Sequence, residues 1–143
     1  MPALSGTEAR ERFAASPIAR LATVDAAGRP HLVPAVFAVA GDRLAMAVDH
    51  KPKRSPRLKR LANIRANAAV SLLVDGYHED WDRLWWARAD GRARVLPPAA
   101  RSAEAARLTA LLVARYPRHY ADRPPSGEVV EVVVTTWTGW RAT

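Results

Sequence analysis

The chain of 143 residues contains no cysteine. Disulfide bonds, thiolate metal sites and cysteine nucleophiles are therefore excluded, and a reducing compartment is permitted. No stretch approaches about 18 apolar residues without a charge, and the charged N-terminus MPALSGTEARERFAAS lacks the apolar core of a signal peptide. We therefore expect a cytoplasmic protein that does not enter a membrane.

The familiar catalytic and nucleotide-binding motifs are also missing. The four histidines, at positions 31, 50, 78 and 119, lack the spacing of a metal site, and neither H-E-x-x-H nor G-x-S-x-G occurs. There is no P-loop and no G-x-G-x-x-G fingerprint. The sequence thus predicts no metal site and offers no catalytic side chain, so that a bound cofactor would have to carry any chemistry.

Apolar runs separated by turn residues predict six strands, with Gly28 and Pro30 in the turn of the first hairpin. The expected strands cover residues 18–25, 31–40, 44–48, 69–77, 84–96 and 128–137. Helical spacing predicts a short helix over 8–14 capped by Ser5 or Thr7, a second helix from Ser55, and an amphipathic third over 102–116 followed by a loop over 118–127.

No linker divides the chain, so we predict one domain over residues 1–143. Strands in close succession with helices outside them indicate an α+β fold, most economically a closed or split β-barrel.

Positive charge is concentrated in one segment. The formal net charge is +8, and no acidic residue occurs from His50 to Val74. Such a segment attracts polyanions, phosphorylated ligands or acidic surfaces. Its basic residues are Lys51, Lys53, Arg54, Arg57, Lys59, Arg60 and Arg65.

The pair Ser55-Pro56 has the form of a helix N-cap followed by proline at the first helical position. The cations just before it would then approach a helix N-terminus, where unpaired backbone N–H groups already favour an anion. Arg57 and Arg60 lie within one turn and can face the same point. We interpret the segment as a phosphate site; a solvated basic surface helix is the alternative.

Five tryptophans are available to line a core or a planar ligand. Trp85 and Trp86 are adjacent on an expected strand and must point to opposite faces, so at most one fills the barrel interior. The other would meet a partner surface or a ligand. With the basic segment, this pattern is typical of a protein that holds a phosphorylated planar cofactor.

The order of three motifs resembles a known family. The motifs are ARLATVDAAGRPHLVPAVF, the basic segment ending LKRLANIRANAAVSLLVDG, and LWWARADGRARV, spanning about residues 16–96. In this order they resemble the flavin/deazaflavin split-barrel oxidoreductases, the pyridoxamine 5′-phosphate oxidase-like family, and in particular its coenzyme F-420-dependent branch. The resemblance implies a six-stranded antiparallel split β-barrel with flanking helices, and a homodimer with cofactor sites at the interface.

The resemblance also implies which residues bind the cofactor. It places Pro34, Ala35 and Val36 along the ring system through their backbone, and Trp86 near it as an aromatic neighbour. The residues implied at the phosphate are Lys51, Lys53, Arg57 and Arg60, with Arg54 as a further candidate.

The implied reaction is hydride transfer between a small organic substrate and the deazaflavin or flavin ring, with the protein supplying orientation and a dry pocket. The many cations favour coenzyme F-420, which has a polyanionic tail, over FMN as the alternative. A non-catalytic cofactor carrier and a nucleic-acid-binding module are rival functions. We disfavour nucleic acid because the cations gather at one loop and helix start and are not interleaved with aromatic residues.

Overall fold

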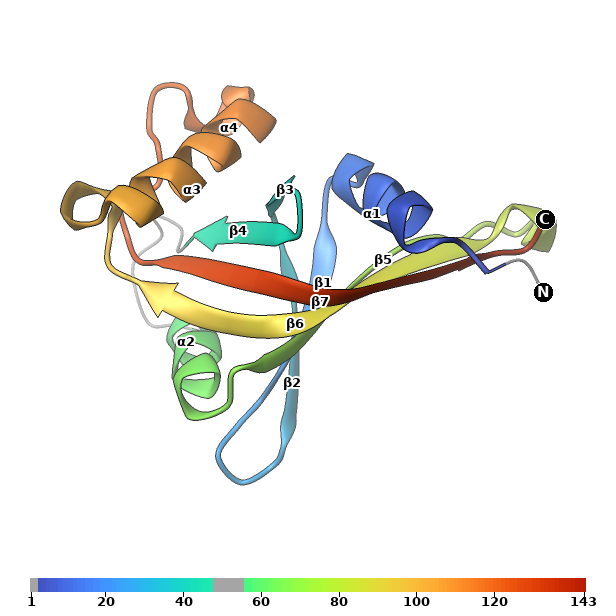
Figure 1. The fold of residues 1–143 in the computed structure, drawn as a ribbon, viewed down its shortest axis with the longest axis horizontal. Coiled ribbons are helices and arrows are strands. Elements are labelled where there is room, and N and C mark those ends of the chain that lie inside the picture. Colours follow the sequence, from blue (N-terminus) through green and yellow to red (C-terminus); the bar gives the residue numbers. More distant parts are fainter. Residues whose placement is uncertain (1–2, 48–55) are drawn as a thin grey trace.

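The computed structural model describes residues 3–47 and 56–143, and one antiparallel sheet organises them (Figure 1). The sheet has seven strands in the order β2-β1-β5-β6-β7-β4-β3. The antiparallel α+β architecture predicted from the sequence is confirmed. The strands are β1 (Ala19–Val24), β2 (Pro30–Ala35), β3 (Ala38–Ala40), β4 (Arg43–Ala47), β5 (Ala69–Gly76), β6 (Trp85–Leu96) and β7 (Val129–Arg141).

The predicted count of six strands is wrong because the run over residues 31–40 forms two strands. It breaks at Val36 and Phe37, so that β2 pairs with β1 while β3 pairs with β4. These two short strands are the opposite edges of the sheet. The chain therefore passes directly from one edge to the other, and the sheet curls without closing into a barrel.

The bend between β2 and β3 is held by a single hydroxyl group. The Tyr116 hydroxyl accepts a hydrogen bond from the Phe37 N–H at 3.1 Å. It also lies 2.8 Å from the Phe37 carbonyl and 3.0 Å from the Pro17 carbonyl, to which it can donate. The Tyr116 side chain thus connects the bend between β2 and β3 to the residues just before β1.

Four helices flank the sheet: α1 (Gly6–Ala15), α2 (Pro56–Ala66), α3 (Ala103–Arg115) and α4 (Pro117–Tyr120). Ser5, rather than Thr7, is the N-cap of α1, and it shares a reciprocal capping box with Glu8. Short 3₁₀ turns occupy Trp81–Arg83 and Ala99–Arg101. Part of the loop expected over residues 118–127 is instead helical, because Pro117 starts a new turn after α3 ends at Arg115.

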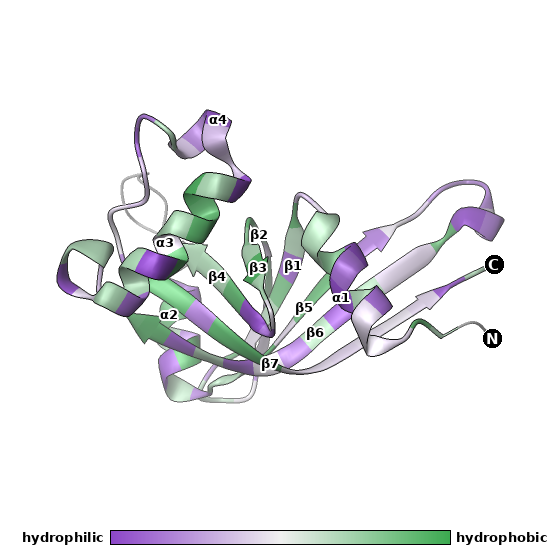
Figure 2. Cartoon of the chain, turned by 45° about the horizontal axis from the view of Figure 1, so that its top comes forward, coloured by the Kyte–Doolittle hydropathy of each residue, from purple (hydrophilic) through white to green (hydrophobic). Residues whose placement is uncertain are grey.

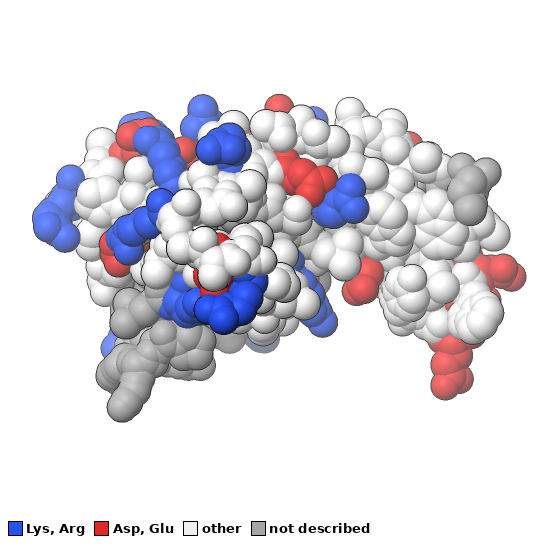
Figure 3. Space-filling model, turned by 90° about the horizontal axis from the view of Figure 1, so that it is seen from below, with Lys and Arg blue, Asp and Glu red and all other residues white. Residues whose placement is uncertain are grey.

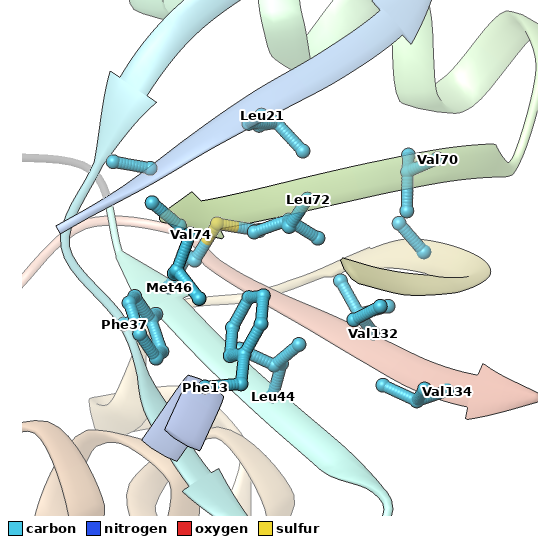
Figure 4. Close-up of a cluster of buried hydrophobic side chains, with 14 of the residues drawn as sticks. Phe13, Leu21, Phe37, Leu44, Met46, Val70, Leu72, Val74, Val132 and Val134 are labelled. Atoms are coloured by element: carbon cyan, nitrogen blue, oxygen red, sulfur yellow. The ribbon is translucent and has the colours of Figure 1, made fainter. Parts of the chain in front are cut away.

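The main core lies inside the curled sheet, where α1, α2 and alternate strand residues meet (Figure 4). Phe13 of α1 and Phe37 are fully buried there, with ring centroids 4.9 Å apart. Val130, Val132 and Val134 of β7 belong to this core.

A second cluster lies under α3, whose apolar side faces β4 (Figure 2). Leu108 and Leu112 are buried in it, as expected from the helical spacing. Among the alanines of α3, Ala105 is buried here, whereas Ala106 and Ala114 are exposed. Alanine is too small to mark a helix face by itself. No helix of the described residues is long and apolar enough to span a membrane.

Replacing Tyr116 with phenylalanine should lower the free energy of unfolding by about 1–3 kcal/mol, because the backbone groups at the bend lose their partner. Urea unfolding followed by tryptophan fluorescence measures this change. The matched control is Thr109→Val in α3, which removes a buried hydroxyl with no hydrogen-bond partner. The control should cause no loss of stability. Equal losses in both variants would mean that the Tyr116 hydroxyl does not hold the bend.

Candidate functional site

Helix α2 is anchored at one end of the sheet, beside the β1–β2 turn. Its Leu61 and Ile64 are buried in the main core. Between them, the Asn63 side-chain amide donates to the Thr23 hydroxyl of β1 at 3.0 Å. Both polar groups are buried, so this hydrogen bond sets how α2 sits against the sheet.

The exposed side of α2 is basic and its first turn contains no acidic residue. Lys59 lies with its ammonium 3.5 Å from the Asp25 carboxylate, and Arg65 forms an ion pair with Glu128. Arg60 is half-buried and also interacts within the protein. The predicted site residues Lys51, Lys53 and Arg54, and the cap Ser55, lie outside the described residues, as does the side chain of Arg57.

Asp25 organises the turn that lies against α2. Its carboxylate accepts hydrogen bonds from the backbone N–H groups of Arg29 and Ala27, at 2.8 and 2.9 Å, and from the Arg29 guanidinium at 3.1 Å. Together these hydrogen bonds lower the pKa of Asp25 to about 2, and the bond from the Arg29 backbone N–H has the largest effect. Asp25 is therefore ionised at neutral pH, where it partly neutralises Lys59 and Arg29.

The predicted division of the two adjacent tryptophans is confirmed. Trp85 packs against the main core, where the Arg12 guanidinium lies 5.1 Å from its ring. Its indole also covers Gly76 so closely that a Cβ there would lie 2.2 Å from the ring nitrogen. Trp86 points to the opposite side of the sheet, which we call the outer face.

Trp86 lines an open pocket of about 230 Å³ on the outer face. The Arg88 guanidinium lies 5.6 Å from the centre of its ring, and the Arg88 Nε donates to Asp90 at 2.9 Å. The pocket combines an aromatic wall, a cation and the carboxylate of Asp75, which forms no ion pair with the part of the chain that the structure describes. Its lining residues are Leu73, Asp75, Tyr77, Trp86 and Arg88.

The three residues expected along the cofactor ring lie at the end of β2. Pro34 is exposed on the outer face, Ala35 is buried in the core, and Val36 is half-buried at the bend. Pro34 pairs with Arg20, which pairs in turn with Leu73 of the pocket. The strands β1 and β5 separate β2 from β6, which corresponds to about 14 Å between Pro34 and the strand of Trp86.

The structure does not bring Trp86 together with α2 within one chain. Trp86 pairs with Asp75 at the far end of β5, whereas α2 ends just before Ala69 at the near end. Six residues of strand separate these points, or about 20 Å. One pocket of a single chain therefore does not contain both predicted parts of the site.

Glu131 is the most buried carboxylate among the described residues. Burial raises its pKa, but hydrogen bonds from Arg94 at 2.7 Å and Arg43 at 2.8 Å outweigh it, and the pKa is lowered. It is therefore a structural anion and not a proton donor. Within residues 3–47 and 56–143, no three histidine or carboxylate side chains come together as metal ligands.

Sequence reasoning missed three residues that position this region: Asn63, Asp25 and Tyr116. The signal for Asp25 was present, since aspartate followed by Gly28 in a tight turn is typical of side-chain capping. The partners of Asn63 and Tyr116 are 40 and 79 residues away in the chain. No local pattern indicates such contacts.

This curled antiparallel sheet, with helices packed on its core, defines an α+β split barrel. The chain belongs to the pyridoxamine 5′-phosphate oxidase family, whose family model matches residues 6–141. The split-barrel fold and the broad family resemblance are therefore confirmed. No curated protein matches the chain in sequence.

Solved structures share the fold over nearly the whole chain. An FAD-binding protein from Mesorhizobium loti is 20% identical with a TM-score of 0.71, and the match covers 96% of this chain and 95% of that one. An FAD-binding protein from Mycobacterium smegmatis is 23% identical with a TM-score of 0.64, covering 98% of each chain. A heme storage protein from Vibrio cholerae is 16% identical with a TM-score of 0.70, covering 94% and 92%. At these identities the likeness establishes the fold alone.

The lowered pKa of Asp25 predicts an acid-dependent loss of stability. Because the folded pKa lies below the ordinary value, the stabilisation is present above about pH 4 and is lost as the pH falls toward about 2. Asp25→Asn should reduce stability at neutral pH and flatten this part of the profile. Unfolding midpoints measured from neutral pH to pH 2 test it, with Glu79→Gln at an exposed carboxylate as control. If the stability of Asp25→Asn falls with decreasing pH as steeply as that of the wild type, Asp25 is not the cause of this pH dependence.

Proposed function

We propose that this chain is an oxidoreductase that transfers a hydride between a flavin-type cofactor and a small organic substrate. Membership of the pyridoxamine 5′-phosphate oxidase family over residues 6–141 is the observation that carries this proposal. Two similar solved structures are named FAD-binding proteins, which supports a flavin-type ligand. When bound, the cofactor supplies the redox chemistry, and the protein binds and orients it.

The described part of α2 fits a phosphate group. The helix has 11 residues, and its first turn carries no acidic side chain that would repel an anion. The phosphate would lie near this N-terminus, with the basic residues of the segment as its counter-charges. We assign these to Lys51, Lys53, Arg54, Arg57 and Arg60, with Pro34, Ala35, Val36 and Trp86 beside the ring system.

A deazaflavin, coenzyme F-420, is the second candidate for the cofactor. The observation that favours it is the density of positive charge between residues 51 and 65, which exceeds what one compact phosphate needs. FMN is favoured by the flavin-binding neighbours of the same fold. The two cofactors therefore have to be compared directly on the purified protein.

We also propose that the protein is a homodimer that packs through the outer face. Leu32, Ile18 and Tyr77 are 67%, 45% and 66% exposed, and they surround the partly buried Leu73 and Trp86 on this side. A monomeric protein rarely leaves so many large apolar side chains on one face.

Titration of the purified protein with FMN, coenzyme F-420 and hemin, followed by tryptophan quenching and absorbance, tests the cofactor. We expect saturable binding of FMN or F-420. Lys53→Glu combined with Arg57→Glu should weaken that binding by at least about tenfold, because two counter-charges of the phosphate become repulsive.

Arg107→Glu combined with Arg118→Glu is the matched control, since it makes the same charge change at exposed positions of α3 and α4. The control should bind like the wild type, and both double variants should retain the fold by circular dichroism. Equal affinity in Lys53→Glu/Arg57→Glu would refute the phosphate site. Tight hemin binding without flavin binding would assign the chain to the heme-binding function of its Vibrio neighbour.

Leu32→Asp should convert the dimer to a monomer, because it places a charge in the centre of the apolar contact. Sedimentation velocity over a range of protein concentrations measures the association. Ala106→Glu, at an exposed position of α3, is the control and should leave the dimer unchanged. A dimer that survives Leu32→Asp with unaltered affinity would mean that another surface mediates association.

A further inference from the structure

We propose that the outer-face pocket binds a small organic cation, and that Asp75 is the residue that selects the positive charge. The pocket is lined by Leu73, Asp75, Tyr77, Trp86 and Arg88. These residues lie in the paired strands β5 and β6 or directly after β5, so the site is complete in one chain. The cation site rests on the geometry of this pocket. Its role as the substrate site rests on the proposed function, because Trp86 also borders the proposed ring site.

The strand register places one carboxylate between two aromatic side chains. Asp75 pairs directly with Trp86 across β5 and β6. Residues paired in this way have Cβ atoms about 4.5–5.5 Å apart. Tyr77 follows two residues after Asp75, lines the same pocket and is 66% exposed. A carboxylate flanked by aromatic rings suits an organic cation, because the carboxylate supplies an ion pair and the faces of the rings attract positive charge.

The positive charge of the pocket lining is already engaged. The Arg88 Nε donates to Asp90 at 2.9 Å, and the guanidinium lies 5.6 Å from the centre of the Trp86 ring. Asp90 is held in turn by the Ser71 hydroxyl, which donates to its carboxylate. Arg88 is therefore balanced by Asp90 and positioned over Trp86. The contact also shows that a cation can reach the Trp86 ring in this pocket.

The charge that remains in the pocket is negative. Asp75 has no ion-pair partner within residues 3–47 and 56–143. Arg20 of β1 pairs with Leu73 in the sheet but is not one of the lining residues. An anionic ligand would be repelled by Asp75, and a neutral ligand would gain only the apolar contact. The charge of the lining thus favours a cation.

The surroundings of the pocket reinforce this preference. Although the formal net charge of the chain is +8, acidic side chains gather at this end of the molecule (Figure 3). A local excess of carboxylates raises the concentration of cations nearby. Besides Asp75, the exposed carboxylates of the segment between β5 and β6 are Glu79, Asp80 and Asp82.

The size of the pocket limits the ligand. Its volume of about 230 Å³ is below the range of about 300–1,000 Å³ that is typical of sites for drug-sized ligands. It therefore fits a compact group such as a quaternary ammonium or an N-alkylated heteroaromatic ring, and a larger molecule would project into solvent. Because the pocket is open, water screens both the ion pair and the ring contact, and we expect a dissociation constant in the millimolar range.

Titration with benzyltrimethylammonium, benzyl alcohol and benzoate at constant ionic strength tests the class of ligand. The three probes share a benzene ring and differ in charge. Amide and indole N–H chemical shifts of the full chain measure both the affinity and the position of binding. We expect saturable shifts around Tyr77 and Trp86 with the cation, and at least about fivefold weaker binding of the neutral and anionic probes.

Asp75→Asn should weaken binding of the cationic probe by at least about threefold, because it removes the charge and keeps the shape of the side chain. Asp82→Asn is the matched control, since it makes the same change at an exposed carboxylate outside the lining. The control should bind like the wild type. Equal weakening in both variants would mean that the general acidity of this end, and not Asp75, attracts the cation.

Arg88→Gln should have the opposite effect and strengthen binding of the cationic probe by about twofold or more, because the guanidinium no longer competes for the Trp86 ring. A merely structural role of Arg88 would not produce this gain. Unchanged or weaker binding in Arg88→Gln, with the fold retained by circular dichroism, would contradict a cation site on this ring.

Equal affinity for all three probes, or shifts confined to residues away from Tyr77 and Trp86, would overturn the inference. So would loss of cation binding in Leu32→Asp, because the site would then not be complete in one chain. Flavin binding without cation binding would refute this site and leave the proposed function intact. Cation binding without flavin binding would support the cation site and refute its role as a substrate site.

Discussion

The crossing of the chain from β2 to β3 is the constraint on which the rest of the structure depends. Because these strands are opposite edges of one sheet, the two residues between them set how tightly the sheet curls. Phe37 fills the core at this point, while the Tyr116 hydroxyl binds its backbone and that of Pro17. The curl in turn creates one enclosed side for α1 and α2 and leaves the other side open as the outer face.

The open side explains why Trp86 and α2, which we propose as parts of the cofactor site, lie so far apart. A single curled sheet offers one core, and helix α2 at one end of it is committed to that core through Leu61 and Ile64. Trp86 is directed away from the core by the alternation of strand side chains. One copy of the chain therefore does not place this aromatic side chain and the basic helix around a single ligand.

Much of the fold could be predicted locally. The alternation of side chains along a strand predicted that Trp85 and Trp86 face opposite sides of the sheet. The capping box of Ser5 and Glu8 at the start of α1 likewise involves only residues close together in the sequence. The run over residues 31–40 was misread because an apolar stretch does not indicate that its two halves join different neighbours. The loop predicted over residues 118–127 missed α4, because proline is also favoured at the first position of a new helix, as at Pro117.

The types of the main elements, the basic segment, the lack of thiols and the family resemblance can be recognised without a structure, because each depends on neighbouring residues or on composition. The fold of the whole chain was needed to see that one bend joins the two edges of the sheet, that Tyr116 holds this bend and Asn63 holds α2, and that Trp86 and α2 lie at opposite ends. These features depend on contacts between residues distant in the chain, and such contacts arise from the packing of the whole core.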